Sequence, residues 1–251
     1  MSLDLNTVLR DWPHESGAIK VRKIAGLDGR EKIQLRIDLG VLQMEMNGRP
    51  DGVRPHGCES LLVYHQQRAE RAVQRGENYE LSAEQCAELQ QEGIQYYHRY
   101  LSLFQINDFA GVVRDTQRNL DLFTFVSEHT EREELSWSMQ QFRPYVLMMN
   151  TRARASILLA QGKFPEAMRE IQRGRDLISE FFQRSNFPEL AAKSSELAFL
   201  DEWLDEVREK RPLSKLEIMQ REMETAIAKE LYERAAELRD AIKLLKTQKS
   251  V

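Results

Sequence analysis

The chain has 251 residues, which is enough for one large domain or two to three small ones. Charged residues make up 30% of it and hydrophobic residues 41%, a mixture typical of helix-rich proteins with broad solvated faces. With 36 basic and 40 acidic residues the net charge is −4. Electrostatic attraction of the protein as a whole to nucleic acid or anionic lipid is therefore not expected.

Neither a leader peptide, a membrane span nor a metal motif is predicted. Residues 1–10 lack the apolar core of a secretory signal, and no apolar run is long enough to cross a bilayer, so we expect a cytoplasmic protein. Cys58 and Cys86 form no CxxC pair, which excludes a zinc ribbon and favours two reduced thiols, although a disulfide stays open. The histidines show no metal-binding spacing, so we expect neither a metal nor another cofactor.

Residues 18–46 hold the predicted β structure, because their apolar and polar side chains alternate with a period of two. The dipeptide Asp28-Gly29 predicts a turn, so we expect a β-hairpin or a small sheet with a long second strand. After Gly40 the apolar positions change face, which we interpret as a bulge or a sharp twist in that strand.

The composition along the chain predicts three regions. The first is a small β-containing region at 1–58, which ends in a loop rich in glycine and proline. A helical, repeat-like body is expected over 59–207, and a helical hairpin over 213–248. Between the last two, residues 208–212 read as a linker. The predicted fold class is therefore mainly α.

Several helix boundaries are predicted inside the body. Ser82 and Gln85 form a capping box, which indicates the start of a helix. One long helix is expected to run through Trp137 to Leu159, and its partner carries Phe164 to Leu177. Asn186 is expected to cap a further helix that runs through Leu197 to Leu204. Asp and Glu residues are spaced as on solvated helix faces.

Two segments of the body share a short sequence pattern, Asn107–Val112 and Gly162–Ala167. Each has a helix breaker, an aromatic residue two positions later and a small or branched residue three positions after that. The pattern resembles the mid-repeat turn of a tetratricopeptide repeat, and a generic pair of antiparallel helices explains it equally well. Either alternative predicts that the aromatic residues are core.

The segment 213–245 predicts two short helices that pack as an antiparallel hairpin. Ser214 and Glu217 form a capping-box pattern for the first helix. Apolar residues then recur at intervals of three and four on both helices, which is an a/d seam. The seam residues are Leu216, Met219, Met223 and Ala226 on the first helix and Leu231, Ala235, Leu238, Ile242 and Leu245 on the second.

The second of these helices contains the run Glu233-Arg234-Ala235-Ala236-Glu237-Leu238-Arg239-Asp240. Together with its flanking apolar positions, this run resembles the UVR motif of the excision-repair proteins UvrB and UvrC, of Clp-type unfoldases and of McsA-type activators of a protein arginine kinase. Tyr232 stands where that family commonly has Phe. The resemblance covers only the hairpin, and no GxxxxGK[ST] sequence accompanies it, so the ATPase of UvrB is not expected here.

The resemblance implies a module that pairs with another UVR hairpin or docks on a protein. We expect a non-catalytic adaptor whose partner is a UvrB/UvrC-type repair protein, a Clp-type unfoldase or a second copy of the chain. Leu231 and Tyr232 at the turn are the predicted contacts. Arg234, Arg239 and Asp240 are expected to set the register through charge pairing.

Two alternatives place function in the N-terminal region. Basic side chains on the predicted β-hairpin suggest a DNA-repair accessory that contacts phosphate or an acidic partner, namely Lys20, Arg22, Lys23, Lys32 and Arg36. A solvated strand face explains the same pattern. The second alternative is an enzyme centred on His56 and Cys58, with Glu59, Asp51 and His65 close enough in sequence to assist.

Overall fold

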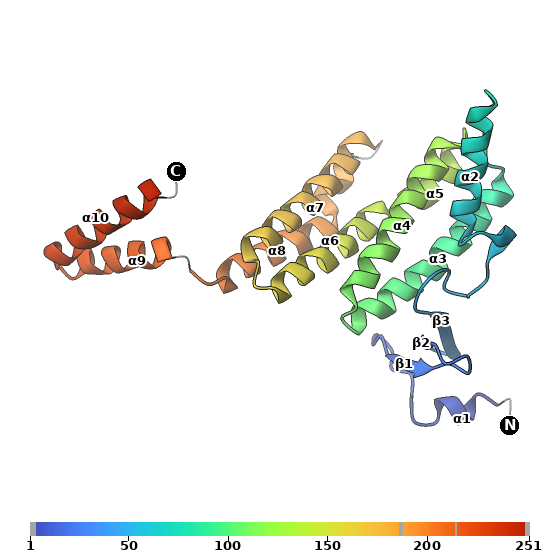
Figure 1. Ribbon diagram of the computed structural model, residues 1–251, viewed down its shortest axis with the longest axis horizontal. Helices are drawn as coiled ribbons and strands as arrows, with labels where there is room; N and C mark the ends of the chain where they lie inside the picture. Colours follow the sequence, from blue (N-terminus) through green and yellow to red (C-terminus); the bar gives the residue numbers. More distant parts are fainter. Residues whose placement is uncertain (1–3, 186–187, 214, 249–251) are drawn as a thin grey trace. The chain divides into compact units, whose positions relative to one another are not determined.

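The computed structural model describes residues 4–185, 188–213 and 215–248. The chain forms two compact units, Met1–Asp205 and Glu206–Val251. The first contains a small β-sheet followed by a layer of helices, and the second contains a helical hairpin (Figure 1). The predicted fold class, mainly α with a small N-terminal sheet and a C-terminal helical hairpin, is confirmed. Among the described helices, none is both long and apolar enough to span a membrane.

Three strands form an antiparallel sheet in the order β1-β2-β3: β1 (Val21–Ala25), β2 (Glu31–Ile37) and β3 (Gly40–Glu45). The predicted turn at Asp28 and Gly29 joins β1 to β2, and Gly29 has a φ of 74°, which glycine adopts without steric cost. Ile33 lies opposite Met44 in the register, and both side chains are buried. Strand β2 contacts helix α3 (Ala83–Gln105), so the sheet shares its core with the helices.

The prediction of one long second strand is wrong. Asp38 and Leu39 form a two-residue turn, and Ile37 pairs with Gly40 across it. The apolar positions change face after Gly40 because a new strand begins there, not because of a bulge. Leu39, which the alternation assigned to the buried face, is 89% exposed at the tip of this second hairpin.

The remaining elements are helical. Two short pieces, α1 (Asn6–Leu9) and a 3-10 turn (Pro55–Gly57), flank the sheet, and another 3-10 turn (Pro188–Lys193) precedes α8. The longer helices are α2 (Leu61–Gln74), α3, α4 (Phe109–Glu128), α5 (Glu133–Gln140), α6 (Arg143–Ala160), α7 (Phe164–Arg184), α8 (Ser195–Lys210), α9 (Lys215–Ala228) and α10 (Tyr232–Gln248). In the first unit α3, α4, α6 and α7 pack each against the next, which Figure 1 shows as a row of ribbons.

The two segments of the body that share a sequence pattern form the same local turn. Asn107 has a φ of 60° and Gly162 a φ of 71°, and each ends a helix in the left-handed conformation. Two residues later Phe109 opens α4 and Phe164 opens α7. The shared pattern therefore corresponds to two tight connections between consecutive helices. Such connections are common to tetratricopeptide repeats and to generic pairs of antiparallel helices.

The single helix predicted through Trp137 to Leu159 is two helices. Helix α5 ends at Gln140, and α6 begins at Arg143 with Pro144 in its first turn. Proline has no backbone N–H and its ring clashes with the preceding turn, so an uninterrupted helix cannot pass this position without distortion. The apolar periodicity continues across the break between α5 and α6, so the periodicity alone predicts a single helix.

Helix α8 also begins later than predicted. Asn186, its predicted cap, lies outside the described residues. The helix begins at Ser195, and the hydroxyl of Ser194 accepts a hydrogen bond of 3.2 Å from the backbone N–H of Leu197. It continues to Lys210, so it includes the first residues of the segment that we interpreted as a linker.

Two carboxylates that the sequence assigned to solvated helix faces are buried. The side chains of Glu92 and Asp115 are 0% exposed. Glu92 accepts the backbone N–H groups of Leu61 and Leu62 at 2.8 and 3.3 Å, which caps the N-terminus of α2, and it pairs with Arg118. A buried charge must be paired and hydrogen-bonded, so these contacts fix how α2, α3 and α4 pack together.

Candidate partner-binding surface

Helices α9 and α10 pack against each other as a hairpin, as predicted. Glu230 has a φ of 57°, and its N–H donates to the carbonyl of Ile227 at 3.0 Å. The N–H of Leu231 donates to the carbonyl of Ala226 at 2.8 Å. These two bonds form a Schellman motif, which satisfies the last carbonyls of α9 and reverses the chain within three residues.

The predicted seam lies between the two helices. Ala226 on α9 and Ala235, Leu238 and Ile242 on α10 are each less than 9% exposed. The alanines carry small side chains, which let the two backbones approach closely near the turn. Leu231 does not belong to this seam, because it is 55% exposed. The Schellman turn rotates it out of the phase that the heptad spacing predicted.

An apolar surface remains uncovered at the tip of the hairpin. We define the tip patch as Ile227, Leu231 and Tyr232, which are 51%, 55% and 67% exposed. All three lie within six residues around the turn. Exposure of three large apolar side chains to water is unfavourable in free energy, and a binding partner that covers them would remove this unfavourable term. The two predicted contacts, Leu231 and Tyr232, both belong to the patch.

A groove of about 520 Å³ runs along the hairpin from the tip patch. Leu231 lines the groove at the tip of the hairpin, and Ile218, which is 44% exposed, lines it further along α9. Its charged lining consists of Arg221, Lys229, Arg234 and Glu222. Three cations against one anion give the groove a positive character, which favours a partner with acidic side chains beside its apolar ones.

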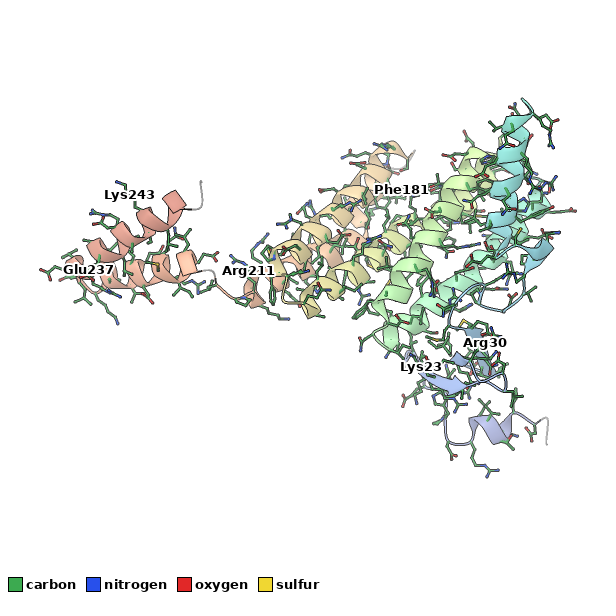
Figure 2. The ribbon with its side chains drawn as sticks, viewed as in Figure 1. Lys23, Arg30, Phe181, Arg211, Glu237 and Lys243 are labelled. Atoms are coloured by element: carbon green, nitrogen blue, oxygen red, sulfur yellow. The ribbon has the colours of Figure 1, made fainter. Side chains whose placement is uncertain are left out.

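The charged residues predicted to set the register are exposed and pair within α10. Arg234 donates to Glu237 at 2.9 Å, and Arg239 lies 3.0 Å from Asp240. Figure 2 labels Glu237 on this helix. Exposed pairs of this kind contribute little to stability, so both arginines can exchange these partners for others at low cost. Their role in the register stays a prediction.

The beginning of α9 is held by an ion pair. Arg211 donates to Glu217 through Nη1 at 2.8 Å and contacts it again through Nη2. These hydrogen bonds raise the pKa of Arg211. The capping box predicted for this helix involves Ser214, which lies outside the described residues. Figure 2 labels Arg211 in the segment before α9.

The five basic residues proposed for nucleic acid all have partners within the chain. These are Glu15 for Lys20, Gln34 and the Trp12 ring for Arg22, Glu31 for Lys23, Glu45 and Asp28 for Lys32, and backbone carbonyls for Arg36. The hydrogen bond with Glu45 raises the pKa of Lys32. In the register Arg22 lies opposite Gln34 and Lys32 opposite Ile24, so Arg22, Lys32 and Arg36 share one face of the sheet. Lys23 lies opposite Ile33 on the other face. A nucleic-acid role stays a prediction.

The residues of the alternative enzyme site point to different neighbours. The ring of His56 stacks on Tyr64 at 4.0 Å, whereas Nδ1 of His65 lies 2.6 Å from the hydroxyl of Tyr79. Sγ of Cys58 lies 3.7 Å from Oε1 of Gln67. Over the described residues, no group of three or more His, Cys, Asp or Glu side chains is placed to hold a metal ion.

Sequence reasoning missed two residues of this surface, Ile218 and Ile227. A signal for them exists, because both fall out of phase with the seam. Ile218 directly precedes Met219 and Ile227 directly follows Ala226, so neither can point at α10 when the seam residues do. Nine residues separate the two, which is about half a turn out of phase on a helix. Ile218 therefore flanks the seam on the side of the groove, and Ile227 flanks it on the other side, at the tip.

Comparison with known families agrees with this geometry. Residues 214–248 match the family model of the UvrB/uvrC motif, UVR. The described part of that stretch is the hairpin α9–α10. Neither a curated protein nor a solved structure matches the chain. The chain therefore carries a UVR motif in its second unit, and the resemblance noted in the run 233–240 is confirmed.

Proposed function

We propose that this protein is a non-catalytic adaptor of the cytoplasm whose UVR hairpin recruits a protein partner. The observation that carries the proposal is the tip patch, in which Ile227, Leu231 and Tyr232 are at least half exposed. The hairpin has its own buried seam, so these side chains are not needed for its fold. The UVR motif takes its name from the UvrB and UvrC proteins, and this supports a role in protein–protein interaction.

The chemistry of the groove favours another UVR hairpin as the partner. The groove offers apolar side chains flanked by Arg221 and Lys229. A hairpin like this one presents the complement, because its apolar tip is bordered by the exposed carboxylates of Glu230 and Glu233. Three sources of such a hairpin are a UvrB/UvrC-type repair protein, a Clp-type unfoldase and a second copy of this chain. The charge pairing of Arg234, Arg239 and Asp240 would select among them.

A pull-down from lysate of the source cells tests the proposal. The baits are the full chain and a chain truncated after Arg211, and the bound proteins are identified by mass spectrometry. We expect a UVR-containing protein to bind the full chain and to be absent from the truncated bait. Its identity separates a role in repair from one in proteolysis, and sedimentation of the purified chain tests self-pairing. Identical partners on both baits would contradict the proposal.

A further inference from the structure

The first unit contains a cavity of about 510 Å³ among helices α3, α4, α5 and α6. Its rim includes Ile94 and Phe142, which are 41% and 52% exposed, so the cavity opens to solvent. Protein interiors rarely leave voids larger than a water molecule, and ligand sites commonly measure about 300–1,000 Å³. The size of this space is that of a small-molecule site.

The lining of the cavity carries no full charge. Within the part of the chain that the structure describes, none of the lining residues is Asp, Glu, Lys or Arg. His98 is the one lining residue that titrates near neutral pH, and burial lowers its pKa, so its ring is neutral there. An ionic ligand would lose its hydration without gaining a counter-charge, which disfavours it strongly.

Aromatic rings and free polar groups meet in this space. The rings of Tyr97 on α3 and Tyr145 on α6 lie 6.3 Å apart at an angle of 56°, and Tyr100 meets Tyr97 edge-on at 5.6 Å. Among the described residues, the side chains of Gln90, Tyr97 and Tyr145 make no hydrogen bond within the chain. A few polar groups that converge in an apolar cavity are the usual means of orienting a ligand.

We propose that this cavity binds a small, uncharged, aromatic molecule that carries a hydrogen-bonding group. The tyrosine rings contact the face and edge of the ligand, and the hydroxyls of Tyr97 and Tyr145 or the amide of Gln90 bond its polar group. This site belongs to the first unit and uses no residue of the hairpin. It is independent of the proposed adaptor role, and either can fail without the other.

Equilibrium dialysis of the full chain against two matched probes tests the charge requirement. The neutral probe is 2-naphthol and the anionic one is 2-naphthoate, which share the ring system. We expect one site per chain for 2-naphthol and a dissociation constant at least about tenfold higher for 2-naphthoate, because a charge is costly to bury unpaired. Equal binding of the two probes, or no binding of 2-naphthol, would overturn the proposal.

Three variants locate the bound probe. Ile94→Trp places a large ring in the mouth and is expected to raise the dissociation constant for 2-naphthol at least about tenfold. Val73→Trp is the control, because Val73 lies on α2 and is 74% exposed. Tyr145→Phe removes one hydroxyl and should weaken binding about fivefold. Thermal melting by circular dichroism verifies that each variant is folded. Unchanged binding by folded Ile94→Trp would place the probe elsewhere and refute the site.

Discussion

Arg99 and Asp115 form a two-point ion pair in which Nε donates to Oδ2 at 2.7 Å and Nη2 donates to Oδ1 at 2.8 Å. The two side chains are 1% and 0% exposed. The remaining donor of Arg99, Nη1, bonds the carbonyl of Glu45 at 3.0 Å, so the pair joins α3 and α4 to the end of β3. The geometry explains why the small sheet does not have to be stable alone, because a buried charge cluster holds it on the helices.

Asp115→Asn should destabilise the first unit by about 3–5 kcal/mol, because it leaves the guanidinium of Arg99 buried without a counter-charge. Urea unfolding of the full chain, followed by circular dichroism, measures the loss. Asp176→Asn is the matched control, since Asp176 is exposed and accepts a bond from Gln172 on the same helix. That change should cost about 0.5 kcal/mol or less. Equal losses for the two variants would show that the buried pair does not stabilise the fold.

Gly174→Ala should destabilise α6 and α7 by about 1–3 kcal/mol through overpacking. A Cβ at position 174 would overlap the side chain of Thr151 on the facing helix. Gly40→Ala serves as the control, because a Cβ at position 40 meets nothing within 4 Å. The midpoints of urea unfolding compare the two changes. If Gly174→Ala is no worse than Gly40→Ala, the close approach of α6 and α7 is wrong.

Glu230→Gly should stabilise the hairpin by about 0.5–1 kcal/mol. Glu230 holds a φ of 57°, a conformation that strains every residue with a Cβ and not glycine. Hydrogen exchange of the α10 amides in the full chain reports the local free energy of opening. In the interior of α9, Glu224→Gly should act in the opposite direction, by about 1 kcal/mol. Slower exchange in Glu224→Gly, or faster exchange in Glu230→Gly, would contradict the observed turn.

Stability should fall as the pH is lowered from 6.5 toward 4, in part through His65. Burial, and then the charges of Arg68 and His56, lower the pKa of His65 from 6.5 to about 4. Between pH 6.5 and 4, His65 is protonated in the unfolded chain and neutral in the folded chain, so acidification favours unfolding. His65→Gln, which retains a bonding partner for Tyr79, removes this contribution. The stability advantage of the natural chain over the variant should therefore shrink across that range. An advantage independent of pH would refute the assignment.

Local signals in the sequence predicted local structure well. The capping box of Ser82 and Gln85 is present at the start of α3, with both reciprocal hydrogen bonds formed. The seam of the hairpin was readable because it repeats at three and four residues between neighbouring helices. Each of these features depends on residues within a few positions of one another, which sequence spacing records directly.

Relationships between distant residues could not be predicted in the same way. Glu92 and Asp115 read as solvated because nothing in a single sequence shows which arginines the fold brings to them. The turn at Asp38 and Leu39 was missed since a period of two is the same in one long strand and in two strands of a hairpin. The aromatic cavity is formed by four helices, and no sequence motif predicts how these helices pack against one another.

The tip patch of the UVR hairpin is proposed to be the surface that binds the partner. The most direct measurement uses the full chain and its Leu231→Asp variant as baits, with the UVR-containing partner quantified by mass spectrometry. Val73→Asp is the control, because Val73 is an apolar residue of the other unit and is 74% exposed, against 55% for Leu231. Loss of that partner by at least about tenfold with Leu231→Asp alone is the predicted result. Retention of the partner by a folded Leu231→Asp chain would contradict the account.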